Sequence, residues 1–369
     1  MKRYLALALS LIMVIMVVAS TSCEKKGAEI KVDVFWYQFG DTYLTSVRNA
    51  METEFKKYSN IKYTMHDCEE DQAKQNQKIE TAITQGTDLL IVNIVTTGSE
   101  ETAQNIANLA KENNIPIIFF NREVSDKVIQ SYAKSCFVGT DADEAGYMQG
   151  KAIAEFLLDS KNLKDGKSIY DLDGNGEISY IMFRGEHGNA EAFGRTKYSV
   201  QEANRLLEGK QLKLKPSPAN ETSTQYDDDG ISNYFLYGNW SAANAAALMR
   251  TALTAYSLTN GQIELIIANN DDQAIGAIEA MNEENFNTGK PDAAGYIPVF
   301  GVDATSVAQE ALKAGKMTGT ILQDGPAMAA CIVKLANNIS LGKDLFADTG
   351  SYNVDAGVNK IRIPYAIVK

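Results

Sequence analysis

From Glu29 onward, short apolar runs alternate with amphipathic segments of helical length, and this alternation restricts the fold more than any other feature. Short apolar runs are typical of strands buried on both faces of a parallel sheet, and the segments between them fit crossover helices. The first half of the chain therefore predicts a doubly wound α/β sheet. Its expected strands are Ile30–Tyr37, Ile61–His66, Leu89–Asn93 and Ile117–Phe120, and its expected helices are Tyr43–Tyr58, Asp71–Gln85 and Ser99–Asn113.

A second series of strands and helices follows and predicts a second α/β lobe of the same kind. Between Gln211 and Asn239 the periodicity fades into a stretch with Pro, Asp and Gly residues, which predicts a long polar surface insertion. The expected strands of the second lobe are Ser179–Phe183, Ile263–Ala268 and Ile297–Gly301, and its expected helices are Glu191–Leu207, Ser241–Tyr256 and Asp271–Asn282.

The N-terminal residues have the pattern of an export signal. Two basic residues precede an apolar run that ends at Ala19, and small residues lead from there to Cys23. A run this short with a small-residue exit is typical of a cleaved signal peptide. We therefore expect removal of residues 1–22, a lipid anchor on Cys23, and a tether over residues 23–27. An ordinary signal peptide cut elsewhere is the alternative, because Ser20 stands where lipoprotein signals usually have Leu.

Charge and cysteine spacing exclude some classes of function. The formal net charge is -12, and loss of residues 1–22 makes it -14, because two basic residues and no acidic residue are removed. Such a chain repels phosphate backbones, so we expect no nucleic acid partner. The remaining cysteines are odd in number and widely spaced, which predicts buried thiols rather than a disulfide framework or a metal cluster. They are Cys68, Cys136 and Cys331.

Polar residues follow several of the predicted strands at the point where each strand ends. Ligands of open α/β sheets bind beyond the carboxyl ends of the strands, so these residues are candidates for a binding site. Each of them alone also fits a helix N-cap. Together they favour a ligand site, and they are Asp41, Tyr43, Asn121, Asn270 and Asp303.

Five collinear stretches resemble the family of periplasmic galactose/glucose-binding proteins. They are Asp71–Asn76, Phe119–Glu123, Val138–Asp141, Ala268–Asp271 and Phe300–Asp303. The resemblance implies the type I periplasmic binding protein fold, which has two Rossmann-like lobes joined by a three-segment hinge. It further implies a protein that closes around D-glucose or D-galactose and delivers the sugar to an ABC importer. The implied N-lobe holds residues 28–138 and 325–359, and the implied C-lobe holds residues 139–324 and 360–369.

The same resemblance implies a sugar site, carried over position by position. A pyranose needs planar acid, amide and guanidinium groups for its hydroxyls and aromatic rings for its apolar faces. Tyr43 and Trp240 fit the aromatic pair. Asn189, Glu191 and Gln323 stand where the family has His, Asp and Asn, so we expect altered affinity and epimer preference. The implied sugar-binding residues are Tyr37, Asp41, Tyr43, Asn121, Asn189, Glu191, Arg195, Trp240, Asn270, Asp303 and Gln323.

Residues 171–179 match the start of a calcium-binding loop of the EF-hand type, with glycine at the sixth position. The twelfth position is Met182, so the usual bidentate glutamate is absent. Glu264 is an acid within an apolar stretch, which is unfavourable unless the acid is paired or binds a metal. The resemblance places a distant glutamate ligand there. We therefore expect a structural Ca²⁺ held by Asp171, Asp173, Asn175, the Glu177 carbonyl, Ser179 and Glu264.

Three other functions stay open at this point. Asp41, Glu191 and Asp303 would surround a sugar with carboxylates, as a secreted glycosidase requires, although nothing singles out an acid with a raised pKa. A sugar-responsive repressor shares the two-lobed fold, but the export signal and the acidic charge disfavour it. A receptor for a pentose, another small sugar or a nucleoside fits the same pattern. We expect a monomeric receptor rather than an enzyme, in the periplasm or cell envelope, with an ABC permease as partner and a chemoreceptor as a candidate second partner.

Overall fold

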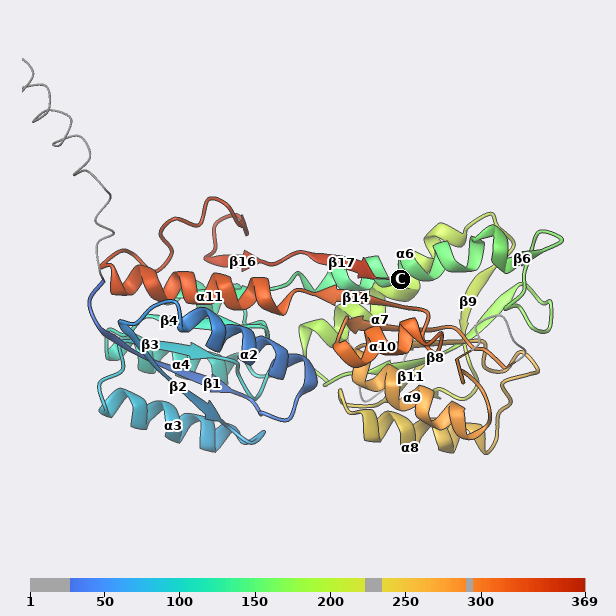
Figure 1. Ribbon diagram of the computed structural model, residues 1–369, viewed down its shortest axis with the longest axis horizontal. Coiled ribbons are helices and arrows are strands. Elements are labelled where there is room, and N and C mark those ends of the chain that lie inside the picture. The colour runs from blue at the N-terminus through green and yellow to red at the C-terminus, as the bar shows by residue number, and fades with distance from the viewer. Residues whose placement is uncertain (1–26, 223–233, 290–294, 369) are drawn as a thin grey trace, which may run out of the picture.

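Two α/β lobes lie side by side in the computed structural model of the chain (Figure 1). The predicted signal peptide over residues 1–22, the lipidation site Cys23 and most of the tether 23–27 lie outside the described residues. Across the described part of the chain, no helix combines the length and the apolar character that a membrane span needs. The described residues are 27–222, 234–289 and 295–368.

The first sheet consists, among the described residues, of β1 (Ile30–Trp36), β2 (Ile61–Asp67), β3 (Leu89–Val92), β4 (Ile117–Phe120), β5 (Ser135–Gly139), β15 (Asn353–Val354) and β16 (Lys360–Arg362). Its order is β15–β16–β5–β4–β3–β1–β2, and every neighbouring pair is parallel except β15 with β16. All residues of β3, β4 and β5 are buried, which explains why these strands are continuous apolar runs in the sequence.

Helices surround this first sheet, and most begin at a side chain that caps the helix. Asp41, Asp71 and Ser99 accept hydrogen bonds from backbone N–H groups in the first turns of the helices that follow them. The helices are α2 (Thr42–Phe55), α3 (Gln72–Thr84), α4 (Glu100–Glu112), α5 (Asp126–Gln130) and α11 (Gly325–Ser340). In Figure 1, α11 runs along the top of this lobe, packed on α2, and α3 lies at the bottom. The thiols of Cys68, Cys136 and Cys331 are buried and free, as predicted.

The second sheet consists, within the described ranges, of β8 (Glu177–Arg184), β9 (Lys213–Pro216), β10 (Glu221–Thr222), β11 (Tyr234–Tyr237), β12 (Leu265–Ala268), β13 (Val299–Asp303), β14 (Gly319–Gln323) and β17 (Tyr365–Val368). Its order is β10–β11–β8–β12–β13–β14–β17, with β9 also paired to β8. Its helices are α6 (Ala142–Leu158), α7 (Ala190–Leu207), α8 (Ala242–Leu253), α9 (Asp271–Glu283) and α10 (Ser306–Lys313). A 3₁₀ turn (Ser160–Asn162) leads from α6 into a hairpin of β6 (Leu163–Lys164) and β7 (Lys167–Ser168).

Close packing of α6 on α7 fixes the helix that carries part of the candidate site. Gly146 on α6 and Gly194 on α7 lie at the contact, where a Cβ on either glycine would collide with the backbone of the other helix. The two backbones therefore approach closely. Glu191 and Arg195 lie on either side of Gly194 on α7, so this close packing fixes their positions.

The observed lobes confirm the predicted fold class of two Rossmann-like lobes, and the predicted strands and helices lie close to the observed ones. The chain crosses between the lobes after β5, after β14, and between β16 and β17. The boundary at residue 360 is wrong, because β16 pairs with β5 in the first sheet and the chain crosses only after Arg362. Lys360 and Arg362 form ion pairs with Glu123 of the N-lobe, a tie that the apolar pattern did not reveal.

The predicted surface insertion over residues 211–239 is partly wrong. β9 pairs with the first half of β8 and β11 pairs with its end, so both ends of this segment complete an edge of the second sheet. Residues 223–233 lie outside the described residues. Strands this short show too little periodicity for recognition from sequence.

Candidate ligand-binding site

A cavity lies between the lobes at the carboxyl ends of the strands. It holds about 430 Å³ of free space, including the part that opens to solvent. All residues of the implied sugar site line this cavity, and Leu44 and Arg122 complete the lining. The N-lobe supplies Tyr37, Asp41, Tyr43 and Asn121, and the C-lobe supplies Asn189, Glu191, Arg195, Trp240, Asn270, Asp303 and Gln323.

The two lobes contact each other beside the cavity, so the cleft is closed. Nη1 of Arg122 lies 3.0 Å from Oε2 of Glu186 in the other lobe. The hydroxyl of Thr97 donates to Oε1 of the same glutamate at 3.1 Å. The backbones of Gly98 and Gly188 meet so closely that a Cβ on Gly188 would collide with Gly98. A ligand in this cavity is therefore enclosed by both lobes.

Asp41 has two roles in the N-lobe wall. Its Oδ1 accepts a hydrogen bond from the backbone N–H of Leu44 at 2.7 Å, which caps α2. Its Oδ2 accepts from the hydroxyl of Tyr37 at 2.7 Å. Burial and the nearby Asp41 carboxylate raise the pKa of Tyr37, so its hydroxyl stays protonated. The guanidinium of Arg122 stacks on the Tyr37 ring, 3.6 Å from the ring centre.

Tyr43 brings an unpaired polar group to the same wall. Its hydroxyl is buried and has no hydrogen-bond partner among the described residues. Burial of an unpaired hydroxyl is unfavourable, so a ligand hydroxyl at this place would compensate for it. Asn121 follows β4 in a left-handed conformation, with φ of 59°, and its Oδ1 accepts from Nδ2 of Asn93 at 3.2 Å.

Arg195 is the centre of the C-lobe wall, because it contacts Glu191, Asn269 and Asp303. Its Nη1 donates to the carbonyl oxygen of Asn269 at 2.8 Å and lies 3.5 Å from Oδ1 of Asp303, while its Nε donates to Oε2 of Glu191 at 3.2 Å. Burial raises the pKa of Asp303 well above its usual range, Arg195 opposes this shift, and Asp271 adds to it. The Asp303 carboxyl is therefore a buried group that accepts from, or when protonated donates to, a ligand hydroxyl.

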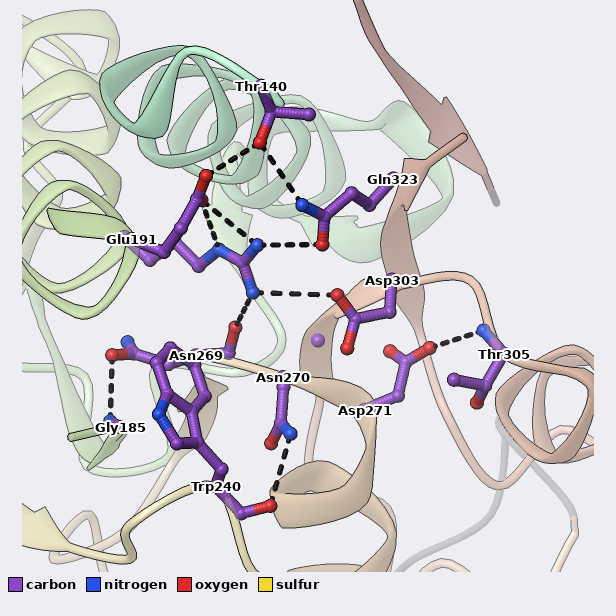
Figure 2. Close-up of polar contacts among 12 residues, drawn as sticks. Thr140, Gly185, Glu191, Trp240, Asn269, Asn270, Asp271, Asp303, Thr305 and Gln323 are labelled. Carbon is purple, nitrogen blue, oxygen red and sulfur yellow. Dashed lines mark hydrogen bonds and ion pairs between the residues drawn. The ribbon is translucent and has the colours of Figure 1, made fainter. Parts of the chain in front are cut away.

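Trp240 provides an aromatic surface on the C-lobe side. Its ring packs on Gly185 so closely that a Cβ there would collide with the ring. Asn270 caps α9 by accepting from the N–H of Gln273 at 3.0 Å, and its amide donates to the carbonyl oxygen of Trp240 at 3.1 Å (Figure 2). Trp240 and Asp303 have φ of 64° and 118°. Such strained conformations concentrate at functional sites.

Besides Leu44, sequence reasoning missed three polar residues at this site. Arg122 directly follows Asn121 beyond β4, so it met the strand-end criterion that found its neighbour. Thr140 and Tyr365 donate their hydroxyls to the carboxylate of Glu191 at 2.6 and 2.7 Å. Both lie on crossing segments, and no local pattern in the sequence indicates where those segments meet.

Three carboxylates converge at the predicted calcium loop. One oxygen from each of Asp171, Asp173 and Glu264 lies within 4.8 Å of the others. Oδ1 of Asp171 is buried without a hydrogen-bond partner among the described residues, whereas its Oδ2 accepts from the N–H of Gly176 at 3.0 Å. A cluster of oxygen donors with an unpaired buried acceptor is the environment that a calcium ion requires.

Glu264 reaches this loop from the residue just before β12. Its Oε1 accepts from the N–H of Leu172 and its Oε2 from the N–H of Ser179, each at 2.7 Å. Burial raises the pKa of Glu264 to about 7, and the nearby Asp173 and Asp171 contribute. A bound cation would relieve this repulsion between the carboxylates.

Two other predicted ligands, Glu177 and Asn175, make contacts within and beside the loop. The side chain of Glu177 forms ion pairs with Lys213 and Lys215 at 3.0 and 2.6 Å, which agrees with a role for its carbonyl rather than its carboxylate. Oδ1 of Asn175 accepts from the N–H of Glu177 at 2.6 Å. The donor set of this loop fits a hard divalent cation.

Known proteins resemble the chain over nearly its whole length. A family model described as a periplasmic binding protein domain matches residues 32–344. The D-galactose/methyl-galactoside binding periplasmic protein of Haemophilus influenzae is 31% identical over 339 residues, covering 92% of this chain and 89% of that protein. The putative rhizopine-binding protein of Rhizobium meliloti is 26% identical over 354 residues, covering 96% and 93%. A solved ABC transporter solute binding protein from Bacillus halodurans, with bound myo-inositol, has a TM-score of 0.68 at 25% identity and coverage of 94% and 96%.

Proposed function

The chain belongs to the periplasmic binding protein domain family, and from this premise and the closed cleft we propose that it binds D-galactose and D-glucose. The protein is a sugar-binding receptor of an ABC importer rather than an enzyme, and it acts in the periplasm. This removes the glycosidase alternative. Closure of the two lobes around the sugar, and presentation of the closed form to the permease, are the mechanism that we propose.

One observation carries the hexose proposal: aromatic side chains from both lobes, together with acid, amide and guanidinium groups, line one cavity between the lobes. Tyr43 and Trp240 offer rigid apolar surface for the two faces of a pyranose. Asp41, Asp303 and Arg195 offer charged partners, which make the stronger hydrogen bonds to its hydroxyls. The relative from Haemophilus influenzae supports galactose, whereas the myo-inositol complex shows that the fold also binds another polyol.

Titration calorimetry of the full chain against a panel of sugars tests this proposal. We expect saturable heat with D-galactose and D-glucose and weaker or no heat with D-ribose, D-xylose and myo-inositol. Heat with a pentose, a nucleoside or an inositol but with neither hexose would overturn the hexose proposal.

A matched pair of variants then tests the site itself. Asp41→Asn keeps the capping oxygen of α2 and removes the charged acceptor, so we expect affinity to fall about tenfold or more. Asp71→Asn is the control, because Asp71 caps α3 outside the cavity. Equal affinities of the two variants would contradict a sugar contact at Asp41.

We also propose that the acidic loop and Glu264 hold a structural Ca²⁺. We expect chelation to lower the melting temperature, because an ion that binds only the folded state stabilises it by mass action. Glu264→Gln should abolish the response to Ca²⁺. Glu177→Gln should retain it, because the side chain of Glu177 pairs with lysines outside the loop. An unchanged melting temperature of the wild-type protein on chelation would contradict the calcium site.

We further propose that Cys23 carries a lipid that anchors the protein to a membrane. In a cell fractionation, Cys23→Ser should move the protein from the membrane fraction to the soluble fraction. The control variant Cys68→Ser should remain in the membrane fraction. A wild-type protein found only in the soluble fraction would contradict the anchor. The monomeric state and the chemoreceptor partner stay predictions.

A further inference from the structure

We propose that Glu191 and Arg195 tie together the three chain segments that cross between the lobes, so that Glu191 controls closure of the cleft instead of contacting the sugar. The ligand assays below rest on the proposed sugar-binding function. The contacts themselves do not, because they join residues of the protein to one another.

Each crossing segment contributes one polar residue to the same cluster. Thr140 lies between the end of β5 and the start of α6. Gln323 is the last residue of β14, just before the chain crosses to α11. Tyr365 is the first residue of β17, just after the third crossing. Figure 2 shows Thr140 between Glu191 and Gln323: its hydroxyl donates to Oε1 of Glu191 and accepts from the side-chain amide of Gln323.

The Glu191 carboxylate uses most of its acceptor positions within this cluster. Its Oε1 accepts from the hydroxyl of Thr140 at 2.6 Å, and its Oε2 accepts from the hydroxyl of Tyr365 at 2.7 Å. The same Oε2 also accepts from Nε of Arg195 at 3.2 Å. Only 6% of Glu191 is exposed. A carboxylate with these partners has little remaining capacity for a ligand hydroxyl.

Arg195 connects the cluster to the cavity. Its Nη2 donates to Oε1 of Gln323 at 3.2 Å and to the hydroxyl of Tyr365 at 3.0 Å, on two different crossings. Its Nη1 lies 3.5 Å from Asp303, which lines the cavity. A rearrangement of the crossings during opening would therefore disturb the same guanidinium that supports the ligand-facing carboxylate. Glu191 and Arg195 are therefore positioning residues: they lie on α7 of the C-lobe and hold the crossing segments by hydrogen bonds.

The decisive test compares ligands rather than a single affinity. A residue that contacts one sugar hydroxyl loses its effect when that hydroxyl is missing, whereas a hinge tie affects every ligand equally. Calorimetry of wild-type protein and Glu191→Gln uses D-galactose and its monodeoxy analogues, each lacking one hydroxyl. We expect the variant to bind every analogue more weakly by one common factor of about ten, as for the loss of one charge-assisted hydrogen bond. One analogue bound equally by both proteins would overturn the proposal.

A second measurement needs no sugar and separates this proposal from the proposed function. Hydrogen exchange of the ligand-free protein should be faster in Glu191→Gln at all three crossings, near residues 140, 323 and 365. Faster exchange confined to α7 would show a local role and overturn the proposal. If wild-type protein binds no hexose, the proposed function fails, while the exchange result still decides the role of Glu191.

Partner and control variants complete the design. Tyr365→Phe removes one hydroxyl from the cluster and should also weaken all analogues by a common factor, and its effect should not add to that of Glu191→Gln. Additive effects would contradict a shared cluster. Asn287→Ala is the control for general destabilisation of the C-lobe. Its buried amide donates to the carbonyls of Ile297 and Lys316 at 2.7 and 3.0 Å, away from the cavity.

Discussion

The C-lobe wall of the cleft carries a connected network of buried charges, whereas the N-lobe wall carries polar groups that bond mainly within the turns that follow their own strands. Arg195 links Glu191, Asp303 and two of the crossing segments. In the N-lobe, Asp41 caps the helix that follows it, and the hydroxyl of Tyr43 has no partner within the described ranges. The difference indicates that the C-lobe wall is organised before a ligand arrives, whereas the N-lobe wall gains a hydrogen-bond partner from the ligand itself.

The sharpest way to break this comparison is to remove the centre of the C-lobe network. Arg195→Met leaves Glu191 and Asp303 as buried carboxylates without their cation, so we expect a loss of about 3–5 kcal/mol in the free energy of unfolding and loss of detectable binding. Arg205→Met is the control on the same helix, because Arg205 forms an exposed pair with Glu202 and should contribute at most about 1 kcal/mol. Urea unfolding and calorimetry measure both effects. Similar unfolding curves for the two variants would show that the buried network adds no stability.

A second prediction concerns the pH dependence of stability that arises from Asp271, the buried residue that follows Asn270 of the C-lobe wall. Burial raises the pKa of Asp271 to about 7, despite hydrogen bonds from Thr320 and Thr305. Between the ordinary pKa of an aspartate and pH 7, the folded protein keeps this proton while the unfolded chain has lost it. Stability from this group is therefore greatest at low pH and falls as the pH rises towards 7, by at most about 1.4 kcal/mol per pH unit.

Asp271→Asn removes this titration, so the gap in unfolding free energy between variant and wild type should widen in favour of the variant from pH 4.5 to 7 and then level off. Urea unfolding at constant Ca²⁺ measures the gap, and the titration of groups that do not interact with Asp271 cancels in the difference. The amide still accepts from the N–H of Thr305 and donates to the hydroxyl of Thr320. A constant gap over this range would show that Asp271 titrates normally.

In both walls, the cavity residues that lie at or after the end of a parallel strand could be predicted from the sequence. Asp41, Asn121, Asn270 and Asp303 each follow an apolar run, and parallel sheets bring such ends together. The C-lobe network was not predictable in the same way. Its partners Thr140 and Tyr365 meet only because of the way in which the crossing segments pair, and sequence periodicity does not report that pairing. The edge strand β9 was missed for another reason, because its four residues are too few to show a period.

A third prediction tests the N-lobe contribution to closure. Arg122→Met removes the ion pair with Glu186 across the cleft while keeping apolar contact with Tyr37, so we expect sugar affinity to fall about tenfold. The unfolding free energy should change less than for Arg195→Met, because Glu186 remains partly solvated. Glu186→Gln should produce a similar loss of affinity, and combining the two variants should add little further loss. Full additivity would show that the two residues act separately.

The smallest expected effect distinguishes the two walls most directly. Tyr43→Phe deletes a buried hydroxyl that has no partner among the described residues, so the free energy of unfolding of the ligand-free protein should rise by up to about 1 kcal/mol. Tyr132→Phe should give the same gain, because its hydroxyl is also buried without a partner in the described part of the chain but lies outside the cavity lining. Only Tyr43→Phe should weaken sugar binding, by a few fold, because only its hydroxyl gains a partner when a ligand enters. If both variants bind sugar like the wild type, the N-lobe wall contributes only apolar contact at this position, and the hydrogen bonds of the site belong to the C-lobe side and Asp41.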